Sequence, residues 1–399
     1  MPKHIFFFDR LLDTPHASMA VERNAEKHSW PVENMLGHFK DFPFYDVYNL
    51  KHIHIFPKED KKYLICFMQM PVLSAPYLSS NAIQELQTND NLFLVLISVH
   101  EYVITPKELT KNLLKRSIPL NKVVVLCSNI EAHDQVLDGV RYIAINFWES
   151  YSRVHIKTLP GSTIVSAQER LDTLNTASKK YISLNRNVKP HRIWWYYSIL
   201  KSEMLDQGHV SFHLPSVNQA EYAMVCAKHW VLKNIPENLH DDFAKAAVRK
   251  MFTRRLDPLS KNMVINYLSS IKNFYTDSVI SLVTESEATK NFITEKTYKA
   301  IANMHPFFII GNPDQHALLR ARGYHTFEDL LGINQVTNYN EAMILLDKLK
   351  NKSLDYLKQE VRENYFDKLV HNQQLFLNRT NSWTTIENAV FTALGTDKV

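Results

Sequence analysis

The chain has 399 residues, of which 45% are hydrophobic and 22% are charged, a balance that is typical of globular proteins and argues against long disordered segments. This length exceeds what one hydrophobic core usually covers, so the sequence predicts two domains. The formal net charge of +5 is too small to indicate a polyanionic partner by itself.

The first half of the chain alternates short apolar runs with helix-like stretches. Strands are expected at residues 3–8, 63–68, 92–99, 123–128 and 142–147, and helices at residues 106–116 and 130–138. The last three strand candidates are rich in Val, Ile and Leu, as parallel strands buried on both faces are. Strand, helix, strand at this spacing predicts a doubly wound sheet. We therefore expect an N-terminal Rossmann-like domain over residues 1–165.

A second α/β region follows residues 152–177, which have no strong apolar period and which we interpret as the crossing between domains. A strand at residues 181–184 then precedes a helix that Pro190 opens and Gly208 ends. Strands at residues 278–284 and 306–310 alternate with helices at residues 294–304 and 312–322. These elements predict a C-terminal Rossmann-like domain over residues 178–375. A last helix, within residues 376–399, is expected to pack back on the N-terminal domain.

The expected fold class is therefore α/β, with two Rossmann-like domains that face a cleft. Ligands bind to open α/β sheets beyond the carboxyl ends of the strands, and the space between two such domains is the default place for a site. Three segments at predicted strand ends carry polar side chains and are the candidates for such a site.

The first candidate is the segment from Phe292 to Gly311. Thr294 is placed as a helix N-cap, with Glu295 and Lys296 in the first turn. A helix N-terminus that follows a strand attracts anions through its N–H groups and its dipole. Lys296 adds a mobile charge for a phosphate, and Glu295 can accept hydrogen bonds from ribose hydroxyls. The alternative, from the pattern alone, is an ordinary capped helix with solvated charges.

Two further strand ends complete the set. The turn from Asn185 to Arg192 includes Arg186 and other basic side chains, and guanidinium groups suit a diphosphate because they make bidentate hydrogen bonds. Glu285 and Ser286 follow the apolar run at residues 278–284. Taken singly, the turn is as well explained by a basic surface, and the carboxylate by a simple strand terminus.

Together these segments resemble a known family. Glu-Ser (285–286), Phe-Ile-Thr-Glu-Lys (292–296) and His-Pro-Phe-Phe-Ile-Ile-Gly (305–311) resemble the donor-binding segment of alpha-fucosyltransferase-type enzymes. That family has a Glu-Asn pair, a Tyr-Ile/Val-Thr-Glu-Lys motif and a Pro-Val-Val/Ile-x-Gly strand at similar spacing. Phage-type predicted glycosyltransferases are more similar still, because they also show a Leu-Asn-Arg…His-Arg turn and a Gly-[Phe/Tyr]-x-Thr-Phe segment, here at residues 323–327. The resemblance covers roughly residues 179–330.

The resemblance implies a glycosyltransferase of the GT-B kind, whose C-terminal domain binds a UDP- or GDP-sugar and whose N-terminal domain binds the acceptor. Arg192 and Lys296 would face the diphosphate, and Glu285 and Glu295 the nucleoside or sugar. Ser286 stands where the family has Asn, so a preference for guanosine and fucose need not carry over. The expected donor-site residues are Asn185, Arg186, Arg192, Glu285, Thr294, Glu295 and Lys296.

Several absent motifs narrow the chemistry. The chain contains no Asp-x-Asp triad, which metal-dependent glycosyltransferases of the GT-A kind usually need. We therefore expect no metal requirement, with positive side chains and helix dipoles stabilising the departing diphosphate. The chain also lacks the Gly-rich signatures Gly-x-x-x-x-Gly-Lys-Ser/Thr and Gly-x-Gly-x-x-Gly, so kinase and dehydrogenase functions lose their main support.

The acceptor hydroxyl needs a base that takes its proton. His100 and Glu101 follow the apolar run at residues 92–99, where a carboxylate could point into the cleft. We favour Glu101 as the base, by resemblance to a family glutamate in a comparable place, and Asp9 is a further candidate. The alternative for each is a surface residue that happens to follow a strand.

Basic residues concentrate between Lys179 and Lys272, where 15 Lys and Arg stand against 7 Asp and Glu. The densest stretch contains Lys245, Arg249, Lys250, Arg254 and Arg255. Phosphate neutralisation by such a face gives salt-sensitive binding of DNA. With the phage-type resemblance, this favours a hydroxymethylated base of double-stranded DNA as acceptor, reached by base flipping or through the major groove. The alternatives are an enzyme acting on a surface glycan or a lipid-linked sugar, and an inactive DNA-binding or scaffold protein with this fold.

The sequence also gives an expectation for the compartment. The three cysteines are scattered, with no CxxC pair, so neither a disulfide framework nor a zinc site is indicated. No window approaches the roughly 18 consecutive apolar residues of a membrane span, and the first apolar run is too short for a signal peptide. We expect a cytoplasmic protein without a membrane partner, in the host cytoplasm if it is phage-encoded.

Overall fold

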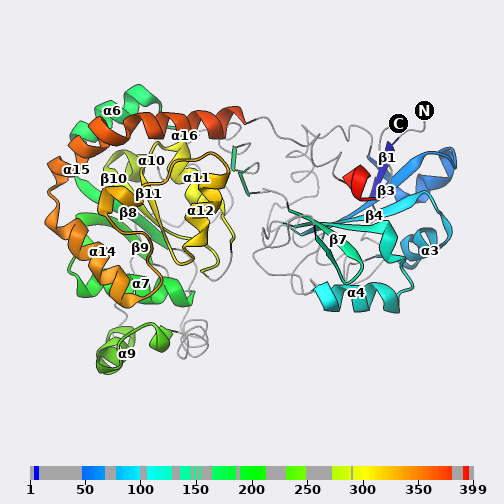
Figure 1. Ribbon diagram of the computed structural model, residues 1–399, viewed down its shortest axis with the longest axis horizontal. Coiled ribbons are helices and arrows are strands. Elements are labelled where there is room, and N and C mark those ends of the chain that lie inside the picture. Colours follow the sequence, from blue (N-terminus) through cyan, green and yellow to red (C-terminus); the bar gives the residue numbers. More distant parts are fainter. Residues whose placement is uncertain are drawn as a thin grey trace. The chain divides into compact units, whose positions relative to one another are not determined.

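The structure is a computed structural model that describes residues 4–8, 47–67, 78–98, 106–127, 135–144, 148–149, 152–153, 164–185, 189–212, 231–248, 272–288, 291–379 and 390–394. The chain divides into two compact units, Met1–Ser150 together with Thr380–Val399, and Tyr151–Arg379. Each unit contains one mainly parallel sheet with helices around it (Figure 1). The predicted α/β class, with two Rossmann-like halves, is confirmed.

The first unit is built on a seven-stranded sheet. Its strands are β1 (His4–Phe8), β2 (Val47–Asn49), β3 (Lys61–Phe67), β4 (Leu92–Ser98), β5 (Val123–Cys127), β6 (Gln135–Leu137) and β7 (Val140–Ala144). Their order is β2-β1-β3-β4-β5-β7-β6. The pairs from β2 to β7 are parallel, and β6 runs antiparallel to β7. Short 3-10 segments lie at Leu50–Ile55 and Leu120–Lys122.

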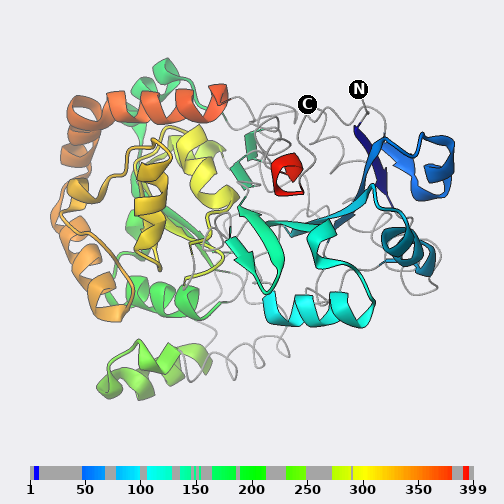
Figure 2. The ribbon, with the colours of Figure 1, turned by 45° about the vertical axis from the view of Figure 1, so that its right-hand side comes forward.

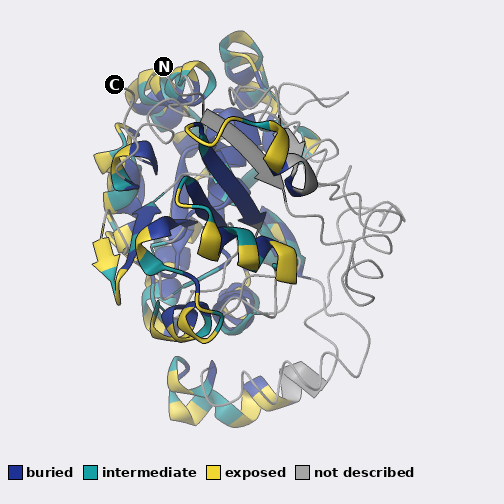
Figure 3. Ribbon diagram, turned by 90° about the vertical axis from the view of Figure 1, so that its right-hand side faces the viewer, coloured by how far each residue is buried: buried dark blue, intermediate teal, exposed yellow. Residues whose placement is uncertain are grey.

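Nearly every residue of β4 and β5 is buried, and because side chains alternate between the faces along a strand, both faces of the sheet are covered there. Leu64 of β3 shares one core cluster with buried leucines of α3 (Ser80–Thr88) and α4 (Pro106–Lys115). Its neighbour Tyr63 packs instead against Phe391 of the C-terminal segment, with ring centroids 5.1 Å apart. Figure 2 shows α4, in cyan, below the strands, and in Figure 3 the exposed side of the helices is yellow while buried strands are dark blue.

One predicted helix of this unit is wrong. Residues 130–138 were expected to be helical, but residues 135–137 form strand β6, which turns back into β7. Asp138 and Gly139 make the turn with φ values of +50° and +81°. Positive φ at both central residues is the signature of a type I′ hairpin, which Asp-Gly favours. Residues 130–134 lie outside the described part of the chain.

The second unit contains a four-stranded parallel sheet with the order β11-β10-β8-β9. Its strands are β8 (Lys179–Asn185), β9 (Gly208–Phe212), β10 (Ser278–Thr284) and β11 (Phe307–Ile310). Every residue of β10 and β11 is buried, as expected for apolar strands covered on both faces.

Helices cover this sheet on both sides. The helices of this unit are α6 (Ala167–Thr176), α7 (Pro190–Lys201), α9 (His240–Val248), α10 (Lys272–Thr276), α11 (Glu295–Ala302), α12 (Asp314–Ala321), α13 (Glu328–Leu331), α14 (Tyr339–Asn351), α15 (Leu354–Glu360) and α16 (Phe366–Asn378). Helix α7 packs on α14, and α11 packs on α16. In Figure 1 the strands lie between α16, above them, and α7, below them. Shorter segments are the 3-10 turns Leu205–Gln207 and Glu237–Leu239 and a π-helical turn at Val361–Tyr365.

Two expectations about this unit are corrected. The segment at residues 152–177 is more than a crossing, because it contains α6, whose fully buried Arg170 donates hydrogen bonds to the carbonyls of Ser278 and Val279. The helix that Pro190 opens ends at Lys201, and Gly208 begins strand β9 instead. A Cβ at Gly208 would lie 2.4 Å from the ring of Tyr181, so this glycine allows a close approach and does not end a helix.

Within the described ranges, no helix combines the length and the apolar character that crossing a membrane requires.

Candidate functional site

The second sheet has a topological switch point between β8 and β10. From β8 the chain passes through α7 to β9 on one side, whereas from β10 it passes through α11 to β11 on the other side. The carboxyl ends of both strands and the N-termini of both helices therefore open onto the same place, which is where open α/β sheets bind ligands. Across this point the Thr284 hydroxyl, at the end of β10, donates to Oδ1 of Asn185, at the end of β8.

Side chains from the start of α7 hold the backbone at the end of β10. Arg192 donates from Nη2 to the Glu285 carbonyl at 3.1 Å, and His191 donates from Nε2 to the same oxygen at 2.7 Å. Both side chains are buried. Burial, and then the charge of Arg192, lower the pKa of His191 well below its ordinary value of 6.5 in spite of the bond to the carbonyl. The imidazole is therefore neutral, and the positive charge here belongs to Arg192.

The carboxylate of Glu285 anchors the start of α11. Its Oε2 accepts from the hydroxyl of Thr294 at 2.5 Å, and its Oε1 accepts from the hydroxyl and the backbone N–H of Thr297 at 2.5 Å and 3.3 Å. Glu285 is completely buried. An anion at a helix N-terminus is stabilised by the N–H groups and the dipole, so Glu285 itself occupies the place that the first-turn N–H groups of α11 would offer to a ligand.

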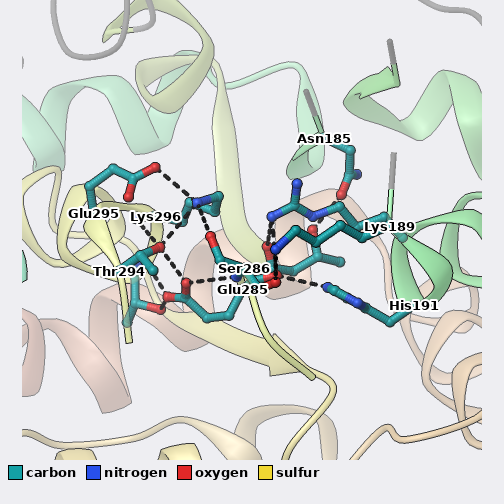
Figure 4. Close-up of polar contacts among 11 residues, drawn as sticks. Asn185, Lys189, His191, Glu285, Ser286, Thr294, Glu295 and Lys296 are labelled. Carbon is teal, nitrogen blue, oxygen red and sulfur yellow. Dashed lines mark hydrogen bonds and ion pairs between the residues drawn. The ribbon is translucent and has the colours of Figure 1, made fainter. Parts of the chain in front are cut away.

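Glu295 and Lys296 form an ion pair in the first turn of α11. The Lys296 ammonium lies 2.9 Å from Oε1 of Glu295, and it also donates to the hydroxyls of Ser286 at 2.9 Å and Thr294 at 3.1 Å (Figure 4). Burial by itself raises the pKa of Glu295, but the charges of Lys296 and Lys299 outweigh it and lower the pKa to about 2. Glu295 is therefore ionised throughout the physiological range.

The predicted helix start is confirmed at this point. Thr294 has an extended backbone, and its side chain accepts from the N–H of Lys296, as an N-cap does. The structure thus brings Asn185, Arg192 and the predicted residues of β10 and α11 to one edge of one sheet. The predicted Thr294, Glu295 and Lys296 lie side by side, and Glu285 lies directly beneath them in contact with Thr294.

Sequence reasoning missed two members of this edge, Thr297 and Glu287. Thr297 carries the third backbone N–H of α11. The first four N–H groups of any helix have no acceptor within the helix, and this need for an outside acceptor is the signal that could have pointed to Thr297. Glu287 pairs with Lys189, whose ammonium lies 3.2 Å from its Oε1. Nothing in the spacing of Lys189 and Glu287 indicates this pairing, because it depends on how β8 and β10 are placed in the sheet.

Other predicted residues fall outside the described part of the chain. These are Asp9, His100, Glu101, Arg186, Arg249, Lys250, Arg254 and Arg255. Lys245 lies within α9. Their predicted roles stay predictions. Among the residues that the structure describes, no group of three or more His, Cys, Asp or Glu side chains could hold a metal ion.

A comparison of the chain with models of known protein families and with curated proteins finds no match. Function is therefore inferred from the fold and from this site.

Proposed function

We propose that the chain is a nucleotide-sugar-dependent glycosyltransferase that needs no metal ion and binds its donor at the carboxyl edge of the second sheet. The observation that carries this proposal is the convergence of Arg192, from α7, and Lys296, from α11, on the switch point between β8 and β10. When a sugar is transferred, the leaving nucleoside diphosphate gains negative charge, and preorganised positive groups stabilise that charge.

The exposure and the contacts of these residues indicate a different role for each of them. Lys296 keeps 24% of its side chain exposed, so its ammonium can exchange a hydroxyl partner for a phosphate oxygen. Arg192 is only 2% exposed and is bonded to the backbone of β10, so its charge acts on the diphosphate from within the unit. Glu295, which is ionised throughout the physiological range, accepts hydrogen bonds from hydroxyls of the ribose or the sugar. Glu285 holds α11 in place for both.

The acceptor side of the proposal rests on residues of the first unit and on the basic stretch. Glu101, with His100 beside it, is proposed to take the proton of the acceptor hydroxyl while the bond between the sugar and the diphosphate breaks. The proposed acceptor is a hydroxymethylated base in double-stranded DNA. Lys245, Arg249, Lys250, Arg254 and Arg255 would neutralise its phosphates.

The test is to incubate the protein with a panel of UDP- and GDP-sugars and hydroxymethylated duplex DNA, with and without a chelator, and then to analyse the nucleosides by mass spectrometry. We expect a glycosylated nucleoside with one donor, unaffected by the chelator, and strongly reduced with Glu101→Gln. A glycan acceptor panel run in parallel distinguishes the acceptor class. If no donor is bound, transferred or hydrolysed, the proposal is wrong and the inactive scaffold takes its place.

A further inference from the structure

Two lysine ammonium groups meet at Ser286, one from each helix that faces the switch point. Lys189, at the start of α7, donates to the backbone carbonyl of Ser286 at 2.5 Å, and Lys296, in the first turn of α11, donates to its hydroxyl at 2.9 Å. Figure 4 shows the two side chains reaching Ser286 from different sides. Because both ammonium groups contact one residue, the oxygens of a single diphosphate can contact both of them.

Each of these lysines is neutralised by its own glutamate. Lys296 pairs with Glu295 at 2.9 Å, and Lys189 pairs with Glu287 at 3.2 Å. The two glutamates differ in freedom. The Glu295 side chain is 10% exposed, whereas that of Glu287 is 26% exposed. Glu287 is therefore the carboxylate that can turn into solvent with the smaller loss of packing.

The backbone that carries Glu287 is held from several directions. The carbonyl of Glu287 accepts from Nε2 of the buried Gln315 at 3.0 Å. The next residue, Ala288, packs against Gly311 so closely that a Cβ there would lie 3.1 Å from the Ala288 Cβ. Contacts with α12 and with the end of β11 thus hold the backbone of Glu287 so that its carboxylate reaches Lys189. Breaking the ion pair requires only a rotation of the Glu287 side chain.

We propose that Lys189 is a second ligand of the donor diphosphate, and that the Lys189–Glu287 ion pair opens when the donor binds. This inference rests on the proposed function and adds a regulatory element to the same site. In the free protein, Glu287 competes with the diphosphate for the ammonium of Lys189. When the donor arrives, the ammonium exchanges the carboxylate for phosphate oxygens, and Glu287 turns away from the incoming negative charge, which would repel it.

The exchange predicts opposite effects for the two partners. Lys189→Ala removes a charge-assisted contact and should weaken the binding of UDP or GDP by about tenfold. Glu287→Gln removes the competing charge while keeping the size of the side chain, and should strengthen binding by roughly two- to fivefold. In the Glu287→Gln background, Lys189→Ala should cost more than it does alone.

The experiment is calorimetric titration of the full chain with UDP, GDP and inorganic pyrophosphate at one ionic strength. The matched controls are Lys272→Ala and Glu169→Gln, which break an ion pair of similar exposure between α10 and α6. They should leave all three affinities unchanged. Thermal melting of each variant shows that it is folded.

Two failures can be told apart. If the wild-type chain binds none of the three probes, both the proposed function and this inference are overturned. If it binds UDP or GDP but Lys189→Ala and Glu287→Gln have the wild-type affinity, the inference alone is overturned. A Glu287→Gln variant that binds more weakly than wild type also overturns it, because Glu287 would then support binding instead of competing with it.

Discussion

The Lys296 ammonium donates hydrogen bonds to the hydroxyls of Ser286 and Thr294 and to the carboxylate of Glu295. These contacts hold it at the switch point. Lys296→Ala should therefore weaken UDP or GDP binding by about tenfold or more, since a charge-assisted contact to a phosphate is lost. The measurement is a calorimetric titration of the variant and the wild type.

The matched control for this variant is Lys350→Ala. Like Lys296, Lys350 pairs with a glutamate, Glu203, and its ammonium also donates to the backbone carbonyl of Ser202, but it belongs to the end of α14, away from the switch point. Its variant should bind as wild type does. Equal affinities for Lys296→Ala and wild type would show that Lys296 does not contact the diphosphate.

In the proposed site, Glu285 is a positioning residue that acts through the first turn of α11. Glu285→Gln replaces one acceptor oxygen by an NH2 group, which then faces hydroxyl and N–H donors of Thr294 or Thr297. We expect a loss of unfolding free energy of about 1–3 kcal/mol, measured by urea unfolding. Donor affinity should fall with it, because the first turn of α11 loses its anchor. Wild-type stability would contradict the anchoring role.

Prediction at the scale of residues succeeded where neighbours in sequence are neighbours in space. Thr294, Glu295 and Lys296 are consecutive, so one helix start places all three. Glu285 shows the limit: its place at the end of β10 was predicted, but its contacts with Thr294 and Thr297 depend on the loop between β10 and α11. Burial of a carboxylate against hydroxyls leaves no pattern in the sequence.

At the scale of elements, Gly311 links the end of β11 to the loop that carries Glu287. Its φ of +133° is strained for any other residue, and a Cβ would lie 3.1 Å from the Cβ of Ala288. Gly311→Ala should therefore destabilise the second unit by roughly 1–3 kcal/mol. It should also change UDP or GDP affinity, because the loop with Glu287 must move.

Gly323→Ala is the control for this change. Gly323 also has a positive φ, +87°, but a Cβ there meets only Leu375, at 3.4 Å. This variant should lose stability without a change in affinity, as measured by urea unfolding and calorimetric titration. If both glycine variants bind UDP or GDP as wild type does, the loop at Ala288 has no part in the site.

Elements with a strong apolar run were predicted well, and those without one were not. Strand β10 was predicted with the bounds that the structure has, since all of its residues are buried. Strand β6 is mostly exposed, and β9 alternates buried and half-buried residues over only five positions. Such strands have little apolar signal of their own. They form because a neighbour, β7 or β8, offers free backbone hydrogen bonds.

At the scale of the whole molecule, the sequence predicted two α/β halves because strand and helix patterns are local. The order of strands is not local, and the switch point between β8 and β10 became visible only from the pairing of β10 with β8. That pairing is what brings the Asn185 turn to the Glu285 strand end. The cleft between the two halves stays a prediction.

Buried histidines link the stability of the second unit to pH. His191, His305 and His316 are each buried, and burial lowers the pKa of each below 6.5, for His316 to about 4. In the unfolded chain these rings take up protons near pH 6.5, and in the folded chain they stay neutral. The contribution of the neutral rings to the free energy of unfolding should therefore be fully present above about pH 6.5, and it should be lost as the pH falls toward 4. Each ring contributes up to about 1.4 kcal/mol per pH unit.

Between pH 6.5 and pH 5, the free energy of unfolding should change with the protonation of these rings and not with that of the carboxylates. The pKa of Glu295 is lowered from 4.5 to about 2, so its own contribution is lost only as the pH falls below about 4.5. Urea unfolding across the window gives the slope. His316 accepts the N–H of Ile309 through Nε2, and His316→Gln keeps an acceptor there but removes a titrating ring. Its slope should be smaller by up to about 1.4 kcal/mol per pH unit, whereas an unchanged slope would mean that the pKa of His316 is not lowered in the folded chain.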